Sequence, residues 1–197
     1  MKRTFLVHHI PGFKGWETCF HFIMEKSDTF RIIFQGNRDA SDADEFLNAG
    51  KQEFLNLPTR TISAYEGMDN SIEVTGELNM VARELFLTFM APSFDGWKPD
   101  LWSFQFLKGN DVMLRVEDFT VGLLFLEESE VEDLLAQGVS VDGTNLEEID
   151  SLSAEVRQSD VEVVRLSKDE LSSLADLLQT TFPADHENVP TPPEDDL

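Results

Sequence analysis

The sequence is poor in cysteine and in positive charge. Its 197 residues include one cysteine, Cys19, and 15 Lys plus Arg against 38 Asp plus Glu, a formal net charge of −23. A lone cysteine cannot form an internal disulfide, which favours a reducing, cytoplasmic location. A chain this acidic is repelled by phosphate backbones and anionic lipid surfaces, so direct nucleic-acid and membrane binding are disfavoured.

The chain also lacks the patterns that mark membrane spans and common active sites. It has no apolar run near the roughly 18 residues that a helical span needs, and no basic-then-apolar leader. It contains no G-x-G-x-x-G, P-loop, H-E-x-x-H, C-x-x-C or G-x-S-x-G motif. We therefore expect no membrane span, no signal peptide and no cofactor. Many active sites have no linear motif, so catalysis stays open.

Charge and aromatic residues divide at one position. Residues 1–126 carry 12 basic and 18 acidic side chains, a net of −6, whereas residues 127–197 carry 3 basic and 20 acidic ones, a net of −17. Fifteen of the 16 phenylalanines and all three tryptophans precede position 127. Aromatic side chains supply much of a core's burial. We predict an aromatic-rich, β-dominated core domain at 1–126, an acidic helical part packed on it at 127–182, and a disordered acidic, proline-rich tail at 183–197.

Alternation of apolar and polar residues predicts a mainly antiparallel sheet in the first part. Residues 16–24 and 29–35 are expected to form a hairpin, joined by a polar turn. Further strands are expected at 5–10, 71–75, 101–107, 112–116 and 119–126, with a turn at Gly109-Asn110. Residues 80–90 fit a strand or a helix, and their Phe-Leu-Thr-Phe sequence favours the strand.

Capping patterns predict the helices. Ser41 begins one that ends before Pro58, and further capping boxes begin at Ser129, Thr144 and Ser167. Residues 160–166 read as a short strand that re-enters the sheet. The expected fold is α+β: an antiparallel, aromatic-rich sheet or open barrel with one early helix and a C-terminal acidic helical part.

Three groups of residues carry weak signals for chemistry. On a strand, Glu17, Cys19 and His21 share one face, but the two-residue spacing is wide for a thiol–imidazole hydrogen bond. His8 and His9 face opposite sides of a strand, so one at most can join a metal site. Residues 141–148 lack the spacing of a calcium loop. We therefore assign no catalytic residue and no metal ligand.

Two aromatic loops resemble each other. Residues 11–16 and 92–99 each place Phe and Trp near Gly and Lys just before an expected strand. Such loops either plug the end of a sheet or form an aromatic rim for a partner, since tryptophan is enriched at interface centres. Trp16 and Trp97 are accordingly candidates for partner contact.

The acidic second part calls for a local explanation, because 17 of the 23 net negative charges lie in its 71 residues. The candidate partner-binding acids are Glu127, Glu128, Glu130, Glu132, Asp133, Glu147, Glu148 and Asp150. A solvated helix face is one explanation, and a surface for a basic protein partner, such as a nuclease or a nucleic-acid-binding protein, is the other. We expect a non-enzymatic cytoplasmic interaction protein with an inhibitor, immunity-type or adaptor role. The alternative is an enzyme or small-ligand-binding module with a pocket in the aromatic-rich sheet.

Overall fold

The computed structural model describes residues 2–36, 48–143 and 145–149. All of them belong to a compact unit that runs from Met1 to Val156, and a second unit, Arg157–Leu197, lies outside the described residues. The predicted tail at 183–197, the helix expected after Ser167 and the strand expected at 160–166 also lie outside them.

Eight strands form one sheet in the described part of the chain. They are β1 (Arg3–Val7), β2 (Thr29–Phe34), β3 (Arg60–Ala64), β4 (Ile72–Glu77), β5 (Ser103–Lys108), β6 (Asp111–Glu117), β7 (Val121–Leu126) and β8 (Leu146–Ile149). Their order is β3-β4-β2-β5-β6-β7-β1-β8, and every neighbouring pair is antiparallel. This confirms the α+β class and the antiparallel sheet.

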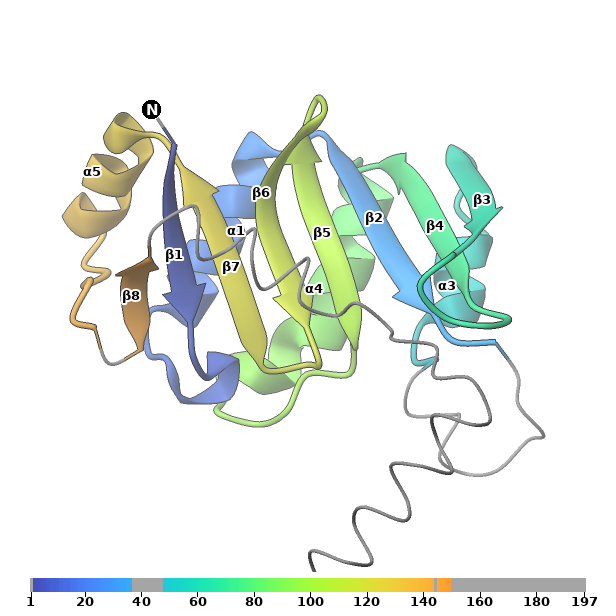
Figure 1. The fold of residues 1–197 in the computed structure, drawn as a ribbon, viewed down its shortest axis with the longest axis horizontal. Helices are drawn as coiled ribbons and strands as arrows, with labels where there is room; N and C mark the ends of the chain where they lie inside the picture. Colours follow the sequence, from blue (N-terminus) through green and yellow to red (C-terminus); the bar gives the residue numbers. More distant parts are fainter. Residues whose placement is uncertain (1, 37–47, 144, 150–197) are drawn as a thin grey trace, which may run out of the picture. The chain divides into compact units, whose positions relative to one another are not determined.

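Helices lie against one face of this sheet (Figure 1). They are α1 (Trp16–Lys26), α3 (Lys51–Leu55), α4 (Met80–Phe94) and α5 (Glu128–Ala136), and a short 3₁₀ turn, η1, spans Ile10–Gly12. Figure 1 shows α1 and α4 behind the central strands and α5 at the β8 end. Arg83 donates to the carbonyls of Leu78, Met24 and Ser27, which ties the start of α4 to the end of α1.

Phenylalanine rings fill the space between the sheet and α4. Along β2, Phe30, Ile32 and Phe34 are buried and alternate with half-buried residues. Phe30 pairs with Phe106 and Ile32 with Phe104 on β5, so one face of the two strands is aromatic. The phenylalanine cluster consists of Phe20, Phe30, Phe34, Phe54, Phe86, Phe104 and Phe106. This cluster is the aromatic-rich core that the composition predicts.

The strands predicted at 101–107, 112–116 and 119–126 are confirmed as β5, β6 and β7. Lys108 pairs with Asp111, so Gly109-Asn110 is the two-residue turn between β5 and β6. Gly109 has φ of +61°, a conformation that a residue with a side chain adopts at a cost.

The hairpin predicted from residues 16–24 and 29–35 is wrong, because 16–26 is the helix α1. Trp16, Phe20 and Met24 are spaced by four, which fits one face of a helix as well as one face of a strand. Cys19 and Ile23 settle the matter, since both are buried and complete a helical face with Trp16 and Phe20. Only the second arm, β2, is a strand.

The strand predicted within residues 80–90 is also wrong, because α4 occupies Met80–Phe94. Asn79 caps it, with its side-chain oxygen accepting from the Ala82 backbone N–H at 3.1 Å. The buried residues of α4 include Ala82, Phe86 and Met90, which recur every four positions and lie on one face of the helix. Burial of this face outweighs the strand propensity of the local sequence.

The acidic segment after residue 126 differs from the prediction in one element. α5 is confirmed as a helix, although its capping box joins Glu127 and Glu130 rather than Ser129 and Glu132. The helix predicted from Thr144 is wrong: Leu146–Ile149 is β8, which pairs with β1 from Thr4↔Ile149 to Val7↔Leu146. Pairing with a distant strand thus outweighs the local capping signal. Strand β3 has no counterpart in the sequence-based predictions.

Candidate functional site

The acidic candidates gather at the β8 end of the sheet. α5 begins immediately after β7, and β8 lies against β1, which is also the neighbour of β7. The Glu127 backbone N–H donates to Glu130 Oε2 at 2.9 Å, and Glu130 is buried at 7% exposure. These two acids therefore begin the helix, where negative charge is also favoured by the helix dipole.

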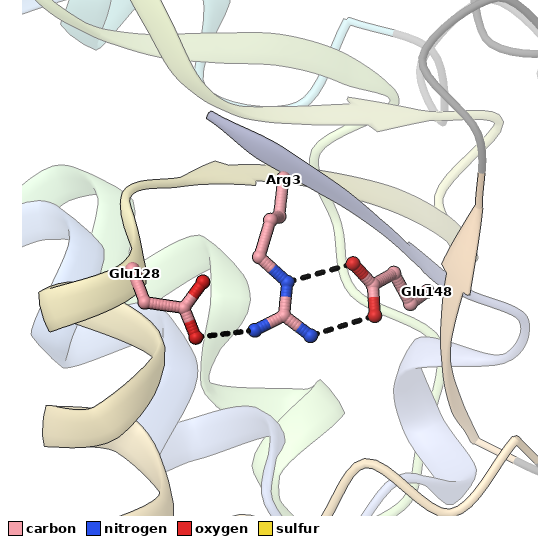
Figure 2. Close-up of polar contacts among 3 residues, drawn as sticks. All are labelled: Arg3, Glu128 and Glu148. Atoms are coloured by element: carbon pink, nitrogen blue, oxygen red, sulfur yellow. Dashed lines mark hydrogen bonds and ion pairs between the residues drawn. The ribbon is translucent and has the colours of Figure 1, made fainter. Parts of the chain in front are cut away.

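Arg3 joins three elements at this end (Figure 2). Its Nε and Nη2 donate to the two carboxylate oxygens of Glu148 at 2.7 and 2.6 Å, and its Nη1 donates to Glu128 Oε1 at 2.9 Å. The hydrogen bonds from Arg3 lower the pKa of the Glu148 carboxyl, and the same bonds raise the pKa of Arg3. The guanidinium thus links β1 to β8 and to the start of α5.

Two more carboxylates have basic partners. His8 Nε2 lies 2.6 Å from Glu147 Oε2, and Lys26 Nζ lies 3.3 Å from Asp133 Oδ2. The side chains of Glu147 and Asp133 are nevertheless 45% and 58% exposed. Glu132 makes no ion pair within the described ranges, and Asp150 lies outside them.

The surface remains strongly negative after these pairs are counted. Residues 127–149 contain eight acids and no Lys or Arg. Arg3 pairs with Glu128 and Glu148, and Lys26 pairs with Asp133; counting these two cations against the eight acids gives 2 − 8 = −6. We call this surface of α5 and β8 the acidic end. The carboxylates of Glu128, Asp133, Glu147 and Glu148 have basic partners and still reach solvent, whereas Glu130 is buried.

The two aromatic loops lie close together, but their tryptophans differ. A Cβ at Gly96 would lie 3.4 Å from the Pro11 carbonyl oxygen, so the loops touch. Trp16 is 1% exposed, and its Nε1 donates to Ser93 Oγ at 2.9 Å. Trp97 is 72% exposed. Of the two predicted contact residues, Trp97 therefore stands at the surface, whereas Trp16 packs in the core.

A strained turn lies beside the second loop. Between β6 and β7, Asp118 and Phe119 have φ of +48° and +67°, values that favour glycine. Trp102 holds both residues: its Nε1 donates to Asp118 Oδ1 at 2.8 Å, and its carbonyl accepts from the Phe119 N–H at 3.0 Å. Lys98 Nζ lies 3.5 Å from the Phe119 ring centroid. The turn is thus held by Trp102 and by Lys98, and Lys98 belongs to the loop that carries Trp97.

Cys19 and His21 do not form a nucleophile and base. Both lie on α1, where residues two apart point in different directions. Cys19 is fully buried, and burial raises the pKa of its thiol to about 12. The His21 ring instead packs on Phe94, with centroids 6.0 Å apart.

The described residues hold no group of three or more His, Cys, Asp or Glu side chains placed to bind a metal ion. A small apolar hollow of about 10 Å³, roughly the room of one water molecule, lies between α5 and the sheet. Its lining residues are Phe5, Leu126, Val131, Leu134, Leu135, Val139, Val141 and Leu146. They offer a ligand apolar contact but no acid, base or side-chain hydrogen bond. In the described part of the chain, no helix has the length and hydropathy of a membrane span.

Sequence reasoning missed the residues that orient the acids. Arg3 lies 125 residues from Glu128 and 145 from Glu148, so no spacing along the chain links them. His8 appeared only as a weak metal candidate, and its contact with Glu147 depends on β1 pairing with β8. Only the order of strands in the sheet brings these residues together.

No protein-family model, no curated protein and no solved structure matches this chain.

Proposed function

We propose that this chain is a non-enzymatic, cytoplasmic interaction protein that binds a basic protein partner through its acidic end. The observation that carries the proposal is the −6 counted on residues 127–149 with Arg3 and Lys26. The side chains of Glu128, Asp133, Glu147 and Glu148 are 65%, 58%, 45% and 46% exposed. Carboxylates held in place by Arg3 and Lys26 lose less freedom on binding than free side chains, which favours specific recognition.

The partner would carry lysines and arginines, and a nuclease or another nucleic-acid-binding protein has that chemistry. Negative charge on this end would steer such a partner into contact and repel nucleic acid itself. Trp97, which is 72% exposed, adds an aromatic anchor of the kind enriched at interface centres. An inhibitor, immunity-type or adaptor role follows from this mode of binding. Cys19 is the one cysteine of the sequence and cannot form an internal disulfide, which favours a cytoplasmic location.

The experiment is affinity capture with the full chain, followed by measurement of the dissociation constant for the purified partner. Glu132→Lys should weaken binding by roughly tenfold, because Glu132 is exposed and free of ion pairs in the described part of the chain. Glu84→Lys is the matched control, an exposed glutamate on α4. Trp97→Ala should also weaken binding by about tenfold or more.

The dependence of the affinity on salt concentration tests whether charge drives the binding. Raising the ionic strength from about 50 to about 500 mM should weaken association markedly, because screening shortens the reach of exposed charges. An affinity that is unchanged by salt, or lowered equally by Glu84→Lys and Glu132→Lys, would count against the proposal.

A further inference from the structure

The two edges of the sheet are unequal. Among the strands that the structure describes, β3 is outermost at one end, and all five of its residues are exposed. It pairs with β4 in an unbroken register from Arg60↔Gly76 to Ala64↔Ile72. β8, at the other end, has four residues, of which two are glutamates. One edge is thus short and charged, whereas the other is longer and regular.

β3 lacks the usual protection of an edge strand. Such strands are normally guarded by charged side chains, proline or a bulge, because their outer N–H and C=O groups are free to pair with another strand. No proline, lysine or acid lies within Arg60–Ala64, and no bulge interrupts its pairing. Its one charged side chain, Arg60, donates back to the Leu57 carbonyl at 2.7 Å. Within the described residues, no strand pairs with the outer hydrogen-bonding groups of β3.

Apolar surface accompanies this free edge. Ile62, at the middle of β3, is 47% exposed. Contact with water at this side chain is unfavourable, and covering it would contribute to association.

The distribution of charge determines at which edge of the sheet a second copy of this chain could pair. The acidic end lies at β8, seven strand positions from β3. At about 4.8 Å per strand this is roughly 34 Å, more than three Debye lengths at physiological salt. Figure 1 shows β3 and β8 at opposite ends of the sheet, so a second copy joined at β3 would keep the two acidic ends far apart. Joining two copies at β8 would bring their glutamates together.

We propose that β3 pairs antiparallel with β3 of a second copy, so that two eight-stranded sheets become one. A twofold axis at Ile62 places Ile62 opposite its own mate, Thr61 opposite Ser63, and Arg60 opposite Ala64. No two like charges face each other in this register. Such a dimer leaves the acidic end and Trp97 of each copy free, so it is independent of the partner proposed above.

The test is the mass of the full chain in solution between about 1 and 200 µM, a range in which micromolar association is measured. We expect a monomer–dimer equilibrium. Ile62→Lys should weaken dimerisation by roughly tenfold or more, because two cations would meet at the twofold axis. Leu135→Lys is the matched control, because Leu135 is 48% exposed and lies on α5 at the opposite end.

Hydrogen exchange of the wild-type chain gives a measurement that needs no variant. Amides of Arg60–Ala64 should become more protected as the concentration rises, whereas those of β8 should not change. A monomer at every concentration, with β3 exchange independent of concentration, would overturn the proposal. So would a dimer that Leu135→Lys dissociates and Ile62→Lys does not. Added salt should leave this dimer intact while it weakens binding of a basic partner, which separates the two proposals.

Discussion

The centre of the sheet and its acidic end are held by different interactions. Phe86 lies among four rings of the phenylalanine cluster, with centroids 4.7 Å from Phe106 and 4.9 Å from Phe54. Arg3 lies at the surface among charged side chains, with three hydrogen bonds to Glu128 and Glu148. Burial acts at the centre and does not depend on salt, whereas water and ions screen the charges at the end. The comparison teaches that many polar contacts need not mean much stability.

The largest effect is expected at the centre. Phe86→Ala should lower the free energy of unfolding by about 3–5 kcal/mol, because it removes a fully buried ring and leaves a cavity among the remaining rings. Urea denaturation measures this loss. Leu135→Ala, at a half-exposed position on α5, is the control and should change little. A loss below about 1 kcal/mol for Phe86→Ala would show that the cluster can collapse around the gap.

The second largest loss of stability is expected from removal of a buried, neutral hydrogen bond between α1 and α4. Ser93→Ala leaves the buried Trp16 Nε1–H without its acceptor, which should cost about 1–3 kcal/mol in urea denaturation. Thr88→Ala is the control on the same helix, since the Thr88 hydroxyl bonds to the Glu84 carbonyl at an exposed position. If the two variants lose the same free energy of unfolding, burial of the Trp16–Ser93 hydrogen bond does not add to its contribution to stability.

The dependence of stability on pH tests the burial of the Cys19 thiol. Its pKa rises from 9.0 to about 12, so the folded chain keeps a proton that the unfolded chain releases. This contribution to stability is complete below about pH 9 and is lost as the pH rises towards about 12. The stability advantage of wild type over Cys19→Ala should therefore shrink over that interval. In the folded chain near pH 8, a thiol reagent should react slowly, and in urea it should react fully. Fast reaction of the native thiol would contradict the burial of Cys19.

The smallest effect on overall stability is expected from Arg3→Gln, because exposed ion pairs contribute little. Its effect should be local: amides of Leu146–Ile149 should exchange faster, since β8 loses the side-chain bonds from Arg3 that add to its backbone pairing with β1. High salt should reduce the difference from wild type. Lys26→Gln, which removes the contact with Asp133 on α5, is the control and should leave β8 unchanged. Unaltered β8 exchange in Arg3→Gln would show that backbone pairing alone holds this strand.

The sequence predicted the elements whose partners are near in the chain. β5, β6 and β7 follow one another through short turns, so alternation within each strand and the Gly109-Asn110 turn were sufficient. α1 was misread because Trp16, Phe20 and Met24 fit both periods, although Cys19 and Ile23 carried the helical signal. β8 was misread because its partner, β1, precedes it by more than 130 residues, and local capping chemistry favoured a helix.

The candidate site shows the same limit. Charge density marks the acidic segment in the sequence itself, and the aromatic loops gave Trp16 and Trp97 alike as candidates for partner contact. The sequence could not show that Trp16 lies in the core or that Arg3 orients Glu148. Both depend on tertiary contacts between residues distant in the sequence.

The position of β1 has a consequence for synthesis of the chain. β1 pairs with β7 and β8, and Arg3 meets Leu126 only after 123 further residues have been made. At roughly 5–20 residues per second, translation leaves β1 without either neighbour for about 6–25 s. During that time its Phe5, Leu6 and Val7 have no strand to cover them. Nascent chains should therefore hold an apolar N-terminal segment open to chaperones until β7 leaves the ribosome, and the centre of the sheet can form before this last strand is added.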